Sequence, residues 1–239
     1  MNIRNPIMAA VLTLGTLAAS TAICADVQVE ATRPVYSNEI RVGMYFLQYD
    51  VHADDLTGPY VPPGVNVDVK SVSTPYIAYV RRLAPNWVLE LAAGVPPKTE
   101  TVGKGPATLG SVPFDGQVVS SAKWFSPSLV MNYVFRDEAA TWRPYLGAGI
   151  NYTKFYDLQS TPAGNAANGG PTAITLTSSV GPVVTAGIRW HFNDHWNAYA
   201  SYDYAMVNSD YTGNTAGVIR KTTIHFNPST LVVSLGYDF

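Results

Sequence analysis

The chain has 239 residues, of which 13% are charged and 12% aromatic, and its mean hydropathy is only +0.05. Soluble globular proteins carry about 25% charged residues, so the charge content is low, whereas the mean hydropathy is too low for a bundle of membrane helices. No basic patch stands out, which argues against nucleic acid as a partner. This composition is typical of a chain in which apolar and polar residues alternate.

The first 25 residues have the pattern of a secretory signal peptide. Arg4 is followed by a short apolar run and then by small residues, and we expect cleavage after Ala25, with Ala22 as the second choice. The alternative, a transmembrane anchor at 7–23, is short for a span and contains Thr, Ser and Gly. Cleavage would remove Cys24, the single cysteine, and leave a mature chain at 26–239 with no disulfide and a formal charge of −3.

The mature chain contains eight segments in which apolar residues tend to recur at every second position, the period of a β-strand. No further apolar run is long enough for a membrane helix. The predicted strands are 39–51, 69–83, 86–98, 118–135, 142–157, 174–192, 196–211 and 219–239. In the sixth, Val180, Val184 and Ile188 share one face with Trp190, whereas the facing of the first two strands is left open.

The connections between these strands alternate in length. Those at 84–86, 136–141 and 193–195 are short, and those at about 51–68, 98–117, 158–173 and 211–218 are longer and rich in Gly, Pro, Asn and Thr. Aromatic residues beside the short turns and the terminus form half of a girdle: Trp87, Tyr133, Phe135, Trp142, Trp190, Phe192, Trp196, Tyr237 and Phe239. Together these features predict an all-β, eight-stranded antiparallel transmembrane β-barrel of the outer membrane, in preference to a soluble β-sandwich or lipocalin-like barrel.

The last ten residues, TLVVSLGYDF, fit this fold. In a closed barrel the last strand pairs with the first, and Leu231, Val233, Leu235, Tyr237 and Phe239 would face lipid. Tyr237 and the terminal Phe239 also resemble the signal that barrel-assembly machinery recognises in its clients. We therefore expect that machinery, together with outer-membrane lipid, among the partners.

Several blocks closely resemble the OmpW family of small outer-membrane barrels over roughly 36–239. They are PSLVMNYVF (127–135), RPYLGAGINYTKFYD (143–157), WVLELAAGVPPKTE (87–100) and the SLGYDF ending, and the second is the most specific. The resemblance implies a narrow, rather hydrophobic lumen that passes small hydrophobic molecules, with possible release sideways into the lipid. The family's constriction is aromatic and aliphatic, but the matching stretch TSSVGPV of the sixth strand has no aromatic residue, so no gate residue is assigned.

Two sets of inward-facing residues are candidates for a role in the lumen. Glu90, Arg189 and Asp203 are charges within strands, and they form either a structural salt-bridge network or a polar stop that forces cargo through the wall. Gly147, Gly149, Gly181 and Gly187 either make room for a ligand or let a tight barrel curve. Inward apolar residues near Val95 and Val180 mark a possible ligand region.

The function favoured by these features is passive uptake of small hydrophobic molecules through a narrow channel or binding lumen. Eight strands leave space for side chains or one small ligand, which excludes a wide aqueous pore. A structural barrel that binds surface partners through its outer loops is the alternative, and a lipid-modifying enzyme ranks below both. No nucleophile motif is present, no cofactor is implied, and His52, His191, His195 and His225 lack metal-ligand spacing.

Overall fold

The computed structural model describes residues 35–49, 51–109 and 111–239. The expected signal peptide at 1–25 lies outside these residues. Strands make up most of the described part, and its one helix, α1 (Pro162–Asn168), is short. No described helix is long or apolar enough to cross a membrane.

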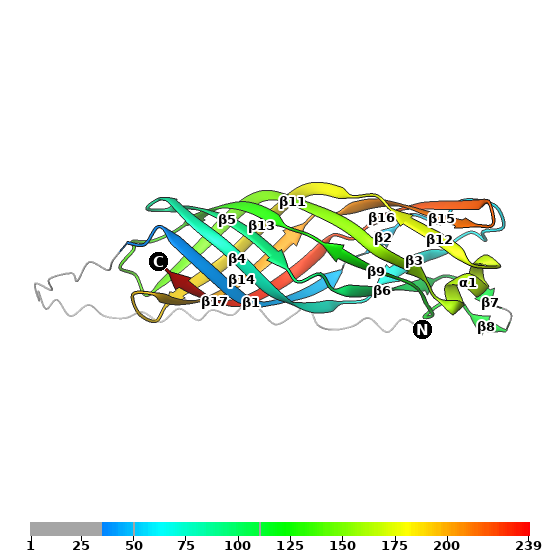
Figure 1. Cartoon of the computed structure of the whole chain (residues 1–239), viewed down its shortest axis with the longest axis horizontal. Coiled ribbons are helices and arrows are strands. Elements are labelled where there is room, and N and C mark those ends of the chain that lie inside the picture. The colour runs from blue at the N-terminus through cyan, green and yellow to red at the C-terminus, as the bar shows by residue number, and fades with distance from the viewer. Residues whose placement is uncertain (1–34, 50, 110) are drawn as a thin grey trace, which may run out of the picture. The chain divides into compact units, whose positions relative to one another are not determined.

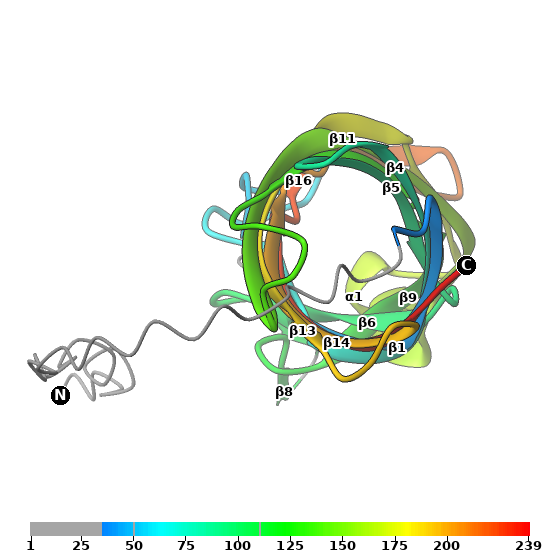
Figure 2. The same ribbon diagram turned by 90° about the vertical axis from the view of Figure 1, so that its left-hand side faces the viewer.

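Eight strands close into an antiparallel ring, as the sequence predicts (Figures 1 and 2). Neighbours in the ring are hydrogen-bonded in the order β10, β5, β4, β1, β17, β14, β13 and β11, and a pairing of β10 with β11 completes the circle. The bounds are β1 (Asn38–Tyr49), β4 (Val72–Ala84), β5 (Trp87–Gly94), β10 (Ser128–Val134), β11 (Trp142–Ser160), β13 (Ser179–His191), β14 (Trp196–Ala205) and β17 (Pro228–Asp238). Closure gives each of the eight strands a hydrogen-bonded neighbour on both sides, the arrangement that lipid favours because unpaired backbone groups are costly there.

The last strand pairs with the first, as predicted. Glu39 lies opposite Asp238 and Tyr49 opposite Pro228, so the β1–β17 pairing runs along nearly all of both strands. The backbone N–H of Phe239 donates to the carbonyl oxygen of Asn38 at 2.9 Å, which ties the terminal residue to the start of the first strand. The carboxyl-terminal segment is therefore held by backbone pairing.

Most of the predicted strands are interrupted at a similar height along the barrel axis, and shorter strands continue beyond the interruption. Prolines contribute to several breaks, because a residue without an N–H cannot complete a ladder: Pro96, Pro97, Pro127 and Pro228. The continuations are β2 (His52–Ala53), β3 (Asn66–Val69), β6 (Lys98–Lys104), β9 (Val118–Phe125), β12 (Thr172–Leu176), β15 (Asn208–Thr215) and β16 (Val218–His225). Only β11 passes through this level, with a register shift between Tyr156 and Gln159.

The outer continuations form two sheets. One contains β3, β6 and β9 and joins the ring through β11, and the other has the order β12, β15, β16 and β2. The long connections add structure that the sequence analysis did not predict, namely α1 and a small hairpin of β7 (Thr108–Leu109) and β8 (Val112–Pro113). Figure 1 shows these elements at the end of the barrel opposite the carboxyl terminus.

The outer surface of the ring is apolar, whereas the continuations expose more charged and polar residues. All nine residues of the predicted aromatic girdle have exposed side chains, between 36% and 59% accessible, and the alternate residues Leu231, Val233 and Leu235 of β17 are also exposed. In β1, Ile40, Val42, Met44 and Phe46 face outward, which settles the facing of the first strand. Exposed residues farther out include several charged or polar ones: Lys98, Glu100, Asp210, Asn214 and Lys221. The apolar band marks the membrane-spanning part.

Candidate functional site: the barrel lumen

A network of buried charges closes the lumen toward the short turns. Arg41 donates to Glu90 Oε2 at 2.8 Å and to Glu39 Oε2 at 3.3 Å, and its guanidinium carbon lies 3.7 Å from the centre of the Tyr199 ring. Tyr76 Oη donates to Glu90 Oε1 at 2.9 Å. We call Glu39, Arg41 and Glu90 the ion-paired plug.

The other predicted charges lie near the plug but form separate contacts. Arg189 pairs with Asp238, and Asn197 Nδ2 donates to the same Asp238 oxygen at 2.9 Å. Asp203 forms no ion pair with a described residue and accepts a hydrogen bond from Thr185 Oγ1 at 2.5 Å. The structure thus places Glu90, Arg189 and Asp203 in the lumen without direct contact between them.

Sequence reasoning missed half of this network. Glu39 and Asp238 are 3% and 8% exposed, and both were overlooked because they stand at strand ends, where alternation is short. A signal was present for Asp238, since it alternates with the lipid-facing Tyr237 and must point inward. Arg41 lies in the predicted first strand, whose facing the sequence leaves open, so the sequence alone does not assign it to the lumen.

The inward glycines accommodate close neighbours. A Cβ atom on Gly147 would lie 1.9 Å from Asn132 Oδ1, and one on Gly187 would lie 2.4 Å from the Tyr145 ring. At Gly149 and Gly181, a Cβ atom would meet the backbone carbonyl oxygens of Leu129 and Met206, each at 2.0 Å. The space above these glycines is occupied by protein, and none of them lines the cavities described below.

Above the plug lies a middle cavity, and beyond it a smaller and mostly apolar cavity, which we call the constriction. The middle cavity, about 630 Å³ including space open to solvent, contains Tyr45, Glu90 and Asp203 in its lining. The lining of the constriction has residues from six predicted strands and includes Tyr49, Trp124, Phe155 and Phe226. The Phe155 and Phe226 rings stack with centroids 5.1 Å apart. Sequence reasoning could not assemble this group, because its members are far apart in the chain.

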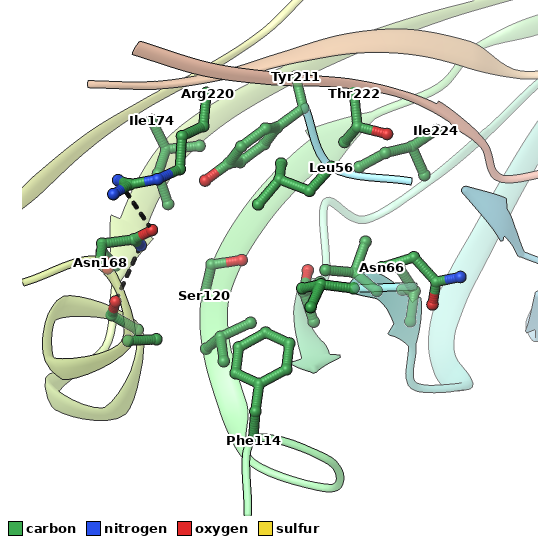
Figure 3. A pocket seen from close by; sticks show the side chains of 18 of the residues that line it. Leu56, Asn66, Phe114, Ser120, Asn168, Ile174, Tyr211, Arg220, Thr222 and Ile224 are labelled. Atoms are coloured by element: carbon green, nitrogen blue, oxygen red, sulfur yellow. Dashed lines mark hydrogen bonds between the residues drawn. The ribbon is translucent and has the colours of Figure 1, made fainter. Parts of the chain in front are cut away.

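A larger cavity lies between the two outer sheets and encloses about 1150 Å³, including space open to solvent (Figure 3). Most of its lining is apolar: Leu56, Val61, Val65, Val67, Val69, Leu109, Phe114, Val119, Phe155, Leu158, Ile174, Leu176, Ile224 and Phe226. We call it the outer cavity. The inward apolar residues near Val95 and Val180 do not line this cavity, but two of them, Ala92 and Val183, line the middle cavity. Val95 and Val180 themselves are exposed on the outside of the barrel, at 55% and 73%.

A separate polar cavity of about 610 Å³, again including open space, lies on the other side of the plug. Its lining includes Glu39, Arg143 and Arg189. Glu39 thus borders this cavity and Glu90 borders the middle cavity, while Arg41 bridges the two carboxylates. The plug therefore separates the apolar spaces from the end of the lumen that carries the short turns.

The barrel wall has an unpaired stretch beside the middle cavity and the constriction. The β5–β10 pairing ends with Ala92 opposite Ser128, and the β6–β9 pairing begins with Lys98 opposite Lys123. Between them, the described residues 93–97 and 124–127 form no register pairs with each other, and three of these positions are prolines without an N–H. We call this stretch the wall window. Ala92, Trp124 and Ser126, which lie at it, also line the middle cavity.

His195 has a structural role at a short turn. His195 Nδ1 lies 2.9 Å from the carbonyl oxygen of Asp238, and its Nε2 lies 3.1 Å from Tyr36 Oη, so the ring helps hold the turn and the carboxyl-terminal strand. In the part of the chain that the structure describes, no three His, Cys, Asp or Glu residues are placed to bind a metal ion.

Known proteins share both sequence and fold with this chain. The model of the OmpW family matches residues 38–239. Outer membrane protein W of Vibrio cholerae is 31% identical over 121 residues, which cover 51% of this chain and 55% of that protein. Outer membrane protein W of Escherichia coli K12 is 26% identical over 142 residues, 56% of this chain and 66% of that protein. These matches therefore span between 55% and 66% of the relatives' length.

Solved structures share the fold at lower sequence identity. The outer membrane protein OprG of Pseudomonas aeruginosa superposes with a TM-score of 0.77 at 21% identity, covering 88% of this chain and 98% of OprG. The outer membrane protein AlkL in lipid bilayers gives a TM-score of 0.62 at 18% identity, covering 95% and 97%.

The family match, the closed ring and the apolar outer band agree in placing this protein in the outer membrane, with its barrel wall against lipid. Members of the family are non-enzymatic barrels, which removes the lipid-modifying enzyme as an alternative. The chain belongs to the OmpW family of outer-membrane β-barrel proteins.

Proposed function

We propose that this barrel mediates passive uptake of small hydrophobic molecules, which enter the outer cavity and leave sideways through the wall window. The observation that carries the proposal is the continuity of apolar space from the outer cavity to the constriction. The two cavities share Val69, Thr99, Phe155 and Phe226 in their linings. Sites for small molecules are typically concave and mostly apolar, with few polar groups.

The route toward the other end of the lumen is unfavourable for an apolar solute. Passing the plug would require separation of Arg41 from two carboxylates in a poorly solvated space, which leaves uncompensated buried charge. The wall window offers another exit, because its backbone pairing is already absent and its outer side faces lipid. This supports the polar-stop interpretation of the lumen charges over a purely structural one.

The proposal is tested by uptake of alkanes and naphthalene-like aromatics into cells that lack the protein and cells in which it is restored. Thr222 lines the outer cavity, and its neighbour Thr223 points out of the barrel and donates to Asp210 Oδ1 at 2.9 Å. Thr222→Trp therefore fills the cavity, and Thr223→Trp adds the same bulk outside as a matched control.

We expect restored cells to take up these solutes faster, Thr222→Trp to abolish that gain, and Thr223→Trp to retain it. Heat-modifiable gel mobility of the same samples verifies that each barrel is folded. Equal uptake with and without folded protein would refute the proposal. Equal uptake by the two tryptophan variants would refute the outer cavity as the route.

A further inference from the structure

The outer cavity contains one buried cation with no carboxylate partner. Arg220 on β16 is 8% exposed, and no described Asp or Glu lies within ion-pair distance of it. Its hydrogen bonds go to three neutral oxygens: Pro59 O at 3.3 Å from Nε, and Asn168 Oδ1 and Thr215 Oγ1, each at 3.4 Å from Nη1. These acceptors fix the guanidinium in place without neutralising its charge.

A buried guanidinium without a carboxylate partner lowers the stability of the folded protein unless another group compensates for its charge. A buried charge is normally paired, because hydrogen bonds to neutral groups do not offset the free energy lost when the charge is removed from water. Arg41 and Arg189 in the same barrel follow this rule and contact carboxylates. Arg143 lacks a carboxylate too, but it donates to three backbone carbonyl oxygens at the short turns and has an evident structural role there. Arg220 instead faces the apolar cavity.

Tyr211 provides a second donor beside Arg220. It lies on β15, and Gly213 of the same strand is opposite Arg220. The Tyr211 hydroxyl oxygen lies beside Gly213, because a Cβ atom on that glycine would be 2.7 Å from the oxygen. Burial raises the pKa of Tyr211, while the charge of Arg220 acts in the opposite direction. The hydroxyl is therefore protonated at neutral pH and can donate a hydrogen bond. Figure 3 shows both polar groups at the same side of the cavity, next to Asn168.

Apolar side chains extend from this polar corner into the cavity. Ile174 and Leu176 come from β12 and Ile224 from β16, and Phe226 continues the apolar lining to the constriction. The cavity thus combines a fixed cation and a hydroxyl donor at one side with a continuous hydrocarbon surface. A guanidinium with a neighbouring hydroxyl matches a carboxylate, since charge-assisted hydrogen bonds to an anion are the strongest kind available.

We propose that the outer cavity binds amphipathic carboxylates, with the carboxylate at Arg220 and Tyr211 and the hydrocarbon chain against the apolar lining. This inference rests on the proposed uptake function and specifies its substrate class: hydrophobic molecules that carry one anionic head.

The test uses purified protein in lipid nanodiscs and a pair of probes, decanoate and the neutral decanol, which share a ten-carbon chain. Binding is measured by equilibrium dialysis, with partition into empty nanodiscs subtracted. Arg220→Gln removes the charge and Arg220→Lys keeps it. Lys221→Gln is the matched control, because this exposed neighbour carries the same charge on the outside. Gel mobility and a thermal unfolding curve establish that each variant is folded.

We expect Arg220→Gln to weaken decanoate binding about tenfold or more while decanol binding changes little, which corresponds to the loss of hydrogen bonds to a charged group. Arg220→Lys should retain part of the preference, and Lys221→Gln should retain all of it. Decanol binding without preference for decanoate, or an equal loss of both probes in Arg220→Gln, would overturn this inference alone. Binding of neither probe to the unaltered protein would overturn the proposed function as well.

Discussion

The ion-paired plug makes a strong prediction about stability. Arg41 is 4% exposed and is the cation that contacts both Glu39, which is 3% exposed, and Glu90. Arg41→Met leaves two carboxylates in the lumen with their principal counter-charge removed, whereas Tyr76 and Asn132 still donate to Glu90. Removing one partner of a buried pair costs about 3–5 kcal/mol, and we expect the free energy of unfolding to fall by that amount.

Replacing all three members of the plug should restore most of this loss. In the triple variant Arg41→Met, Glu39→Gln, Glu90→Gln, no charge of the plug remains, so the penalty for an uncompensated buried charge is absent. Urea unfolding in lipid vesicles, followed by tryptophan fluorescence, measures both variants against the unaltered protein. An unchanged free energy of unfolding for Arg41→Met, or a triple variant as unstable as the single one, would refute the reasoning.

Three further predictions follow from local contacts. Gly147→Val should lower the free energy of unfolding by about 1–3 kcal/mol, because its Cβ atom would overlap Asn132 Oδ1, and urea unfolding measures this. Phe239→Ala should reduce the yield of folded barrel in cells more than its stability in vitro, if the terminal aromatic is the assembly signal. The Lys70 ammonium, 2.7 Å from Glu100, holds the pKa of Glu100 below its usual range, so Lys70→Gln should raise that pKa in an NMR titration.

Each of these three has a control. Gly170→Ala should leave stability almost unchanged, since its Cβ atom would make an ordinary contact, 3.5 Å from Thr215. Equal losses of yield and of in vitro stability in Phe239→Ala would contradict an assembly role. Because the pKa of Glu100 is lower in the folded state than in the unfolded state, its ionisation stabilises the protein at pH values above the usual pKa of a glutamate. This stabilisation is lost as the pH falls through the folded-state pKa. Both side chains of the pair are about half exposed, so the effect on stability is small.

The ring of strands could be predicted from the sequence because its causes are local. Alternation along each strand, short turns at one end and aromatics beside them all follow from the contact of every strand with lipid on one side and the lumen on the other. The strand breaks were harder to predict. Prolines at 96, 97 and 127 lie inside or beside runs that still alternate, and the pattern alone does not show where pairing stops.

The lumen site could be predicted only in part, because it depends on contacts between distant segments. Glu90 and Arg189 were found as charges on alternating strands, but their partners Arg41 and Asp238 lie 49 residues away in each case. Arg220 was not identified at all, since its setting depends on Pro59, 161 residues away, and on Asn168 in an unpredicted helix. Spacing along the chain carries no signal for such contacts.

The central claim is that apolar molecules occupy the outer part of the lumen and do not pass the plug. Methyl NMR of the protein in nanodiscs, titrated with naphthalene, tests this most directly. Ile174, Leu176 and Ile224 report on the outer cavity, and Val88 and Val134 line the polar cavity beyond the plug. The account predicts saturable shifts for the first group and none for the second. Shifts of equal size in both groups, or none in the outer cavity, would contradict it.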